Sequence, residues 1–107
     1  MTQEVRSSEF QQEVITASQT VPVLVDFWAP WCGPCRMMAP ILEEVGQKMG
    51  AAVKLVKVNT DDNPELAGEY RITGIPCLVV FKGGVEVDRL VGVRPAGALE
   101  TALKKHA

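Results

Sequence analysis

Two cysteines separated by two residues, Cys32 and Cys35, lie at the junction of two differently patterned segments. The run before them, 21–28, is almost continuously apolar and predicts a strand buried on both faces. The segment after them has the apolar spacing of a helix. A Cys-x-x-Cys pair between a strand and a helix is typical of a redox-active dithiol. The second thiol can resolve a disulfide that the first has formed with a substrate, because both lie within one helical turn.

The predicted helix start also bears on the reactivity of Cys32, which should lie just ahead of, or at, a helix that begins near Pro34. The positive end of the helix dipole and the free backbone N–H groups there favour the thiolate, which is the attacking species. Cys35 should lie deeper in the helix, be less exposed and act as the resolving thiol.

Zinc binding is the alternative use of such a pair. A closed zinc site takes four ligands, and the chain offers only Cys32, Cys35, Cys77 and His106. His106 is the penultimate residue of a predicted terminal helix, and there is no second Cys-x-x-Cys. We therefore predict a redox dithiol and no bound metal.

The size and composition of the chain indicate one globular domain, residues 1–107, without repeats or linkers. A net charge of −2 gives no reason to expect nucleic acid or an anionic membrane as partner. No run approaches the roughly 20 apolar residues of a membrane span, and no signal peptide is recognisable. Three cysteines cannot form a closed disulfide framework, which favours a reducing compartment such as the cytoplasm. The mature form of an organelle protein, such as one of the chloroplast stroma, would have the same features.

The remaining segments predict an α/β fold with a mixed sheet between helices. The first helix, capped by Ser7 or Ser8, should bury Phe10, Val14 and either Ile15 or Ala17. A proline at position 40 should kink the second helix, and Lys82-Gly83-Gly84 predicts a hairpin between the last two strands. Helices are predicted at 7–18, 34–49, 64–70 and 95–106, and strands at 21–28, 53–58, 77–81 and 85–91.

Two charged residues fall inside predicted strands, Asp26 and Lys57. Burial should raise the pKa of the Asp26 carboxyl, and a carboxyl poised near neutrality is suited to take the proton from Cys35 as that thiol attacks. Lys57 on the neighbouring strand would modulate this carboxyl. The alternative is that Asp26 is a strand-edge residue that reaches water and that Lys57 lies on a solvated face.

Two further features adjoin the dithiol. The Ile75–Pro76 bond stands before a predicted strand, where an X-Pro bond can be cis, although the sequence alone does not decide this. Trp31 is either a core aromatic or, as its place in the loop between strand and helix favours, a partly exposed platform for substrate.

With these residues identified, the chain resembles the thioredoxin family over essentially its whole length. The run Trp31-Cys32-Gly33-Pro34-Cys35 is the redox signature of that family. Details of the sequence are most similar to the m-type group of cyanobacteria and chloroplasts. The further matches are Phe27-Trp28-Ala29, Asp26, Pro40, Lys57, Gly74-Ile75-Pro76, Gly84 and Gly92, with the m-type details in 29–31, 58–61 and 81–84.

The resemblance implies the thioredoxin fold, a central mixed sheet of about five strands flanked by four helices. It implies that Cys32 is the exposed attacking cysteine, that Cys35 resolves, and that Asp26 is the buried acid and base with Lys57 as its neighbour. Pro76 would be cis and face the dithiol, and its flanking backbone would pair with a bound substrate strand. The implied substrate-binding surface consists of Trp31, Gly33, Pro34, Gly74, Ile75, Val91, Gly92 and Val93.

The implied function is that of a protein-disulfide reductase, an electron carrier with no cofactor beyond its reversible Cys32–Cys35 disulfide. Its partners would be protein disulfides and a thioredoxin reductase, either NADPH- or ferredoxin-linked, and the chain would be a monomer. One alternative is a scaffold whose dithiol is incidental. Another is an oxidase or isomerase of exported proteins, against which Pro34 and the lack of a recognisable signal peptide argue.

Cys77 departs from the family pattern, because most thioredoxins carry threonine after the proline at this site. One interpretation is a small, inert side chain that points into the core. The other is a regulatory third thiol beside the dithiol, open to glutathionylation or to an alternative disulfide.

Overall fold

The computed structural model describes residues 2–107 and forms a five-stranded sheet in the order β1-β3-β2-β4-β5. Strand β2 is central; β3 pairs with it in parallel, and β1 pairs in parallel with β3. On the other side β4 is antiparallel to β2, and β5 completes the predicted hairpin. The mixed sheet is therefore confirmed. The strands are β1 (Gln3–Glu4), β2 (Val23–Trp28), β3 (Lys54–Asn59), β4 (Cys77–Lys82) and β5 (Val85–Val91).

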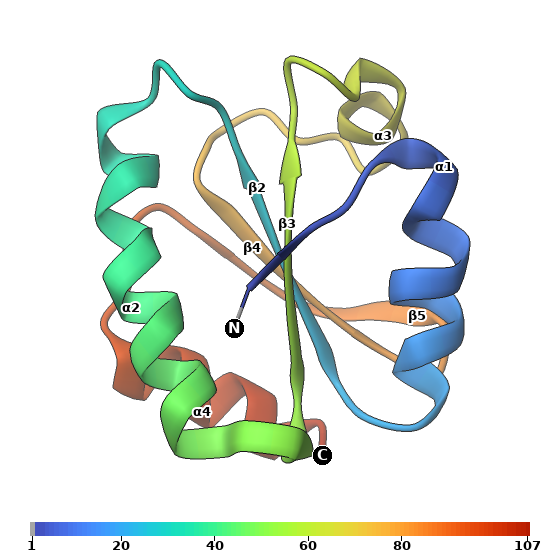
Figure 1. Ribbon diagram of the computed structural model, residues 1–107, viewed down its shortest axis with the longest axis vertical. Coiled ribbons are helices and arrows are strands. Elements are labelled where there is room, and N and C mark those ends of the chain that lie inside the picture. The colour runs from blue at the N-terminus through green and yellow to red at the C-terminus, as the bar shows by residue number, and fades with distance from the viewer. Residues whose placement is uncertain (1) are drawn as a thin grey trace.

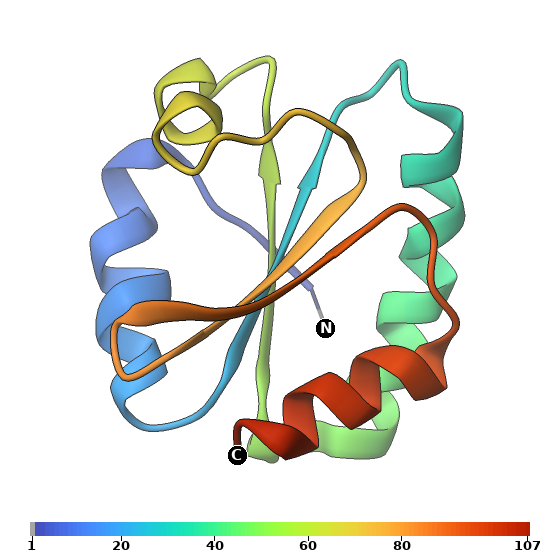
Figure 2. The same ribbon diagram turned by 180° about the vertical axis from the view of Figure 1, so that it is seen from behind.

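Helices cover both faces of this sheet (Figures 1 and 2). Helices α2 (Gly33–Met49) and α4 (Ala96–Lys105) lie on one face, and α1 (Ser7–Phe10) and α3 (Pro64–Glu69) lie on the other. Helix α1 continues into a π-helical segment, η1 (Gln11–Thr16), and a 3-10 turn, η2 (Ala17–Gln19), and a second 3-10 turn, η3 (Gly50–Ala52), follows α2. In the described part of the chain no helix is long and apolar enough to cross a membrane.

The N-terminal region differs most from the prediction. Strand β1 was not predicted, because a strand of two exposed residues shows no alternating pattern. The cap of α1 was also predicted wrongly: Arg6 is the N-cap, and Ser7 is already helical. The Ser7 N–H donates to Asn63 Oδ1 at 2.9 Å, so a distant side chain does what a local serine was expected to do.

Strict alternation along β2 and β4 divides the core between the two faces. Val25, Phe27 and Cys77 pack on the α1 side, whereas Leu24 and Leu78 pack on the α2 side. The same alternation places Asp26 and Trp28 on the α2 side, since they stand two and four positions after Leu24. Pro40 lies inside α2, which continues past it to Met49. The sheet thus presents one ionisable residue of its central strand to the helix that carries both cysteines.

Candidate active site

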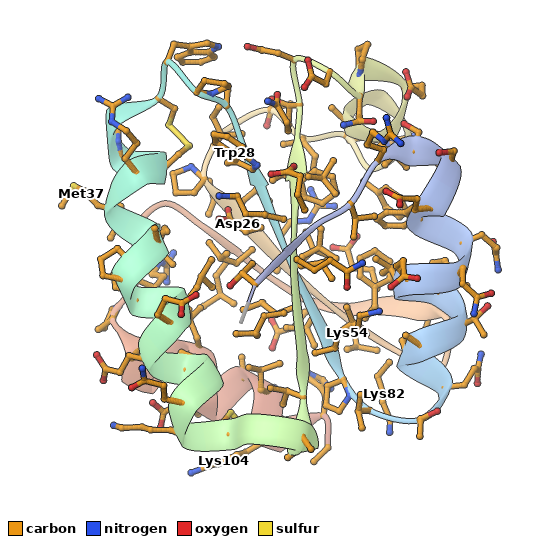
Figure 3. The ribbon with its side chains drawn as sticks, in the orientation of Figure 1. Asp26, Trp28, Met37, Lys54, Lys82 and Lys104 are labelled. Carbon is orange, nitrogen blue, oxygen red and sulfur yellow. A yellow bond between two sulfur atoms is a disulfide. The ribbon has the colours of Figure 1, made fainter. Side chains whose placement is uncertain are left out.

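The dithiol lies at the N-terminus of α2, where Cys32 and Cys35 form a disulfide (Figure 3). Cys32 is the N-cap residue with an extended backbone, and its sulfur accepts a hydrogen bond from the Cys35 N–H at 3.2 Å. Pro34 lies in the first turn, as predicted, and the helix begins one residue earlier, at Gly33. The Cα atoms of the two cysteines are 5.2 Å apart, within the range of an ordinary disulfide. The Cys32 sulfur therefore lies at the positive end of a 17-residue helix.

The expected contrast in exposure between the two cysteines is wrong for this disulfide state. Cys32 is 4% exposed and Cys35 is 5% exposed, so neither is open to solvent. Both cysteines pack with Ala29 and against the half-buried Trp28 and Ile75. In the disulfide, each sulfur also shields the other from solvent. The difference between them lies in their surroundings, since only Cys35 lines the cavity that also contains Asp26.

The Ile75–Pro76 segment lies against the disulfide. Its peptide bond is cis, and the Ile75 carbonyl oxygen lies 3.9 Å from the Cys32 sulfur. The Gly92 N–H donates to the Pro76 carbonyl at 2.8 Å, which ties the end of β5 to this loop. A Cβ on Gly74 would lie 3.2 Å from a methyl group of Val91. The structure thus brings together residues from two distant parts of the sequence beside the dithiol.

Several of the residues around the disulfide carry exposed apolar side chains. Trp31 is 68% exposed, so the core interpretation is wrong, and its indole N–H donates to the Asp61 carboxylate at 3.0 Å. Val91 and Val93 are also exposed. Sequence reasoning missed Met37, whose exposed side chain projects from the first turns of α2 (Figure 3). It also missed Asp61, because a turn aspartate gives no signal that it will hold a tryptophan.

Asp26 is buried under the dithiol helix, at 3% exposed on the central strand, so it is not a strand-edge residue. Its Oδ1 atom has no hydrogen-bond partner in the described part of the chain. Burial raises the pKa of its carboxyl from 3.8 to about 7, with Lys57 lowering it and Glu4 raising it. A carboxyl with this pKa can take up or release a proton at neutral pH.

Lys57 is half-buried and is paired with Asp26 in the parallel register of β2 and β3. Its Nζ atom lies 4.3 Å from the centroid of the Trp28 ring, a cation–π arrangement. Within residues 2–107 it forms no ion pair. Lys57 is therefore not a freely solvated side chain.

A cavity of about 500 Å³ joins these groups. It lies between β2, β3 and α2, and Figure 3 shows Asp26 and Trp28 facing this space. Asp26, Lys57 and Cys35 line it together with Arg36 and Glu43 of α2. Cys35 and Asp26 therefore share this cavity, and a proton that leaves the Cys35 thiol would enter the space that Asp26 lines.

Cys77 lies on the other side of the sheet from this cavity, with Val79 and Phe81 in the core that faces α1 and α3. It is 1% exposed and is a free thiol. Burial raises the pKa of the Cys77 thiol and so disfavours the reactive thiolate. These observations favour the structural interpretation of Cys77, and its regulatory role remains a prediction.

The four candidate zinc ligands do not come together. His106 follows the C-terminus of α4, and its Nε2 atom lies 3.3 Å from an Asp88 carboxylate oxygen of β5, whereas the disulfide lies at the start of α2. Residues 2–107 contain no group of three or more histidine, cysteine or acidic side chains arranged to hold a metal ion.

A two-cysteine disulfide at a helix start, beside a cis-proline and above a buried carboxyl, defines the class of thiol–disulfide oxidoreductases. The sequence model of the thioredoxin family matches residues 1–105. The chain is 53% identical to thioredoxin 1 of Nostoc sp. over 103 residues, which cover 96% of this chain and 94% of that protein. It is 52% identical to the thioredoxin of Bacillus subtilis over 84 residues (78% and 81% of the two chains). It is 43% identical to the chloroplastic M-type thioredoxin of Chlamydomonas reinhardtii over 102 residues (95% and 71%).

The chain belongs to the thioredoxin family. Thioredoxins are protein-disulfide oxidoreductases that act through the cysteine pair itself and need no cofactor. The family interpretation and the redox interpretation of the Cys-x-x-Cys pair are both confirmed.

Proposed function

We propose that the chain reduces disulfides in target proteins, with Cys32 as the attacking thiol, Cys35 as the resolving thiol and Asp26 as the proton acceptor. The observation that carries this assignment is the asymmetry of the disulfide. The Cys32 sulfur accepts the Cys35 N–H at the start of α2, whereas Cys35 lines the cavity shared with Asp26.

In the first step the Cys32 thiolate attacks one sulfur of the substrate disulfide. A mixed disulfide forms between Cys32 and that sulfur, and the other substrate sulfur leaves as a thiolate. The helix dipole and the Cys35 N–H stabilise the negative charge on Cys32 before the attack.

In the second step Cys35 attacks the Cys32 sulfur. Asp26 takes the proton of the Cys35 thiol, the Cys32–Cys35 disulfide forms, and the second substrate sulfur leaves as a thiolate. Two electrons have then passed from the dithiol to the substrate. Asp26 can accept this proton at neutral pH, because its pKa is about 7. Lys57 would modulate this carboxyl from the next strand.

Substrate would dock on the surface formed by Trp31, Val91 and Val93 with the backbone beside Pro76. Residues 74–76 precede β4 and lie outside the strands of the sheet, although the Pro76 carbonyl accepts the Gly92 N–H. The backbone before the cis-proline would pair with an extended substrate strand. This surface would be completed by Gly33, Pro34, Gly74, Ile75 and Gly92. The three glycines leave the backbone there open to an extended substrate strand.

The chain would be one thioredoxin domain and a monomer, and a thioredoxin reductase, NADPH- or ferredoxin-linked, would supply two electrons to return it to the dithiol. Its compartment would be the cytoplasm, or the chloroplast stroma if it is the mature form of an organelle protein.

A trapping experiment tests the assignment of the two cysteines. The Cys35→Ser variant, mixed with a disulfide-containing protein such as insulin, should accumulate a mixed disulfide on Cys32 that reductant releases. The matched Cys32→Ser variant should trap little and should not reduce insulin. Equal trapping by both variants, or full insulin reduction without Cys32, would overturn the assignment.

A further inference from the structure

Three ionisable side chains form a row across adjacent strands beneath the dithiol. The parallel register pairs Glu4 of β1 with Lys57 of β3, and Lys57 with Asp26 of β2. Residues paired in a parallel sheet point to the same face, so all three point towards α2. Val5, the next residue after Glu4, is buried in the opposite cluster, as this alternation requires.

The indole of Trp28 contacts two members of this row, Glu4 and Lys57. Its N–H donates to the Glu4 carboxylate at 3.4 Å, and the Lys57 ammonium lies over its ring, 4.3 Å from the centroid. Lys57 is thus held beside the indole, and the Asp26 Oδ1 atom is left without a hydrogen-bond partner in residues 2–107. A cation that paired directly with Asp26 would favour the ionised carboxylate.

We propose that Glu4 is a positioning residue of the active site, whose carboxylate, bound to the Trp28 indole, draws the Lys57 ammonium away from Asp26 and so keeps Asp26 available as a proton acceptor near neutral pH. This inference deepens the proposed function, because it rests on Asp26 acting as the acceptor.

The charge of Glu4 acts on Asp26 in two ways. It competes for Lys57, and it also repels a second negative charge about 10 Å away, across two strand spacings. Both effects hold the carboxyl in its neutral form. Besides Asp26 and Lys57, the charged residues that line the cavity are Arg36 and Glu43 of α2. Cys35 also lines it and can ionise when it is reduced. The Arg36 guanidinium donates to the Pro30 carbonyl at 2.9 Å.

The direction of the pKa shift agrees with this geometry. Lys57 lowers the pKa of Asp26, and Glu4 raises it, on top of the larger effect of burial. On β4 the residue opposite Asp26 is Leu78, which carries no charge.

The test is a ¹³C NMR titration of the Asp26 carboxyl in the oxidised full-length protein. Glu4→Gln removes the charge but keeps an oxygen that can accept the Trp28 N–H. Glu44→Gln is the matched control, because Glu44 is an exposed carboxylate on α2 that pairs with Lys48. The pKa of Asp26 should fall by about 0.3 to 0.5 unit in Glu4→Gln, as expected for a partly screened charge at this distance, and it should stay unchanged in Glu44→Gln.

An unchanged or raised pKa of Asp26 in Glu4→Gln, or an equal fall in both variants, would overturn the inference. The titration needs no catalysis, so this outcome is separate from the fate of the proposed function. If Glu4→Gln reduces insulin normally but leaves the pKa of Asp26 in place, the role of Glu4 is refuted and the dithiol mechanism stands.

Discussion

Asp26 and Lys57 occupy paired positions on neighbouring central strands, yet the Lys57 ammonium lies over the Trp28 ring and forms no ion pair within residues 2–107. The Asp26 carboxyl is buried, and among residues 2–107 no cationic group forms an ion pair with it. Such an arrangement weakens the fold when the carboxyl is ionised. In the proposed mechanism the same carboxyl would accept the proton of Cys35.

The stability of the oxidised protein should fall as pH rises because of Asp26. The pKa is 3.8 for an ordinary aspartate and about 7 in the folded chain, so the folded state binds more protons than the unfolded state between these values. The free energy of unfolding should therefore decrease through this window, by up to about 4 kcal/mol at pH 8. Asp26→Asn, which stays neutral, should be more stable than wild type at pH 8 and close to it at pH 4.

Urea denaturation at the two pH values measures this difference. Asp62→Asn, which changes an exposed carboxyl, is the control and should alter stability by less than about 0.5 kcal/mol at either pH. An Asp26→Asn variant whose advantage is the same at pH 4 and pH 8 would show that the carboxyl is not titrating in this window.

Replacing Trp31 should weaken substrate docking without unfolding the protein. The side chain is 68% exposed and its indole is held by Asp61, so Trp31→Ala should change stability little. Loss of an apolar contact with substrate should lower kcat/KM for insulin reduction about tenfold, mainly through KM. Val85→Ala is the matched control, because Val85 is 60% exposed in the hairpin at the other end of the sheet, and it should leave kcat/KM unchanged.

The thiol of Cys77 should be inert in the folded protein. Its burial removes access and raises its pKa, so both requirements for reaction are unmet. In the oxidised protein, iodoacetamide at pH 8 should label no cysteine in buffer and one cysteine in denaturant, as counted by mass spectrometry. Rapid labelling or glutathionylation of Cys77 in buffer would instead support the regulatory interpretation.

Two glycines should respond in opposite directions to the same substitution. Gly92 has a φ of +92° and donates its N–H to Pro76, so Gly92→Ala should destabilise the fold by about 1–3 kcal/mol and slow insulin reduction. Gly97 lies in α4 with open space around it, and Gly97→Ala should stabilise by about 0.5 kcal/mol with no effect on activity. Thermal unfolding and insulin assays on both variants check the pair, and a neutral Gly92→Ala would contradict the role given to this backbone.

Much of this architecture was predictable because its signals are local. The apolar run of β2, the helical spacing of α2 and the glycine pair of the hairpin each act within a few residues. The short strand β1 and the capping of α1 by Asn63 were not predictable, since both depend on partners more than 50 residues away.

The strand–dithiol–helix junction, a carboxyl within an apolar strand and the family could all be predicted before folding was considered, because they depend on the order and spacing of residues. Other relationships are visible only in the folded chain: Pro76 is cis beside Cys32, Cys77 faces away from the cavity of Asp26, and Lys57 lies over Trp28. Strand register and packing set these relationships. They bring together side chains that have no local signal for one another, and a charged residue in a strand acquires its pKa only from what surrounds it in the fold.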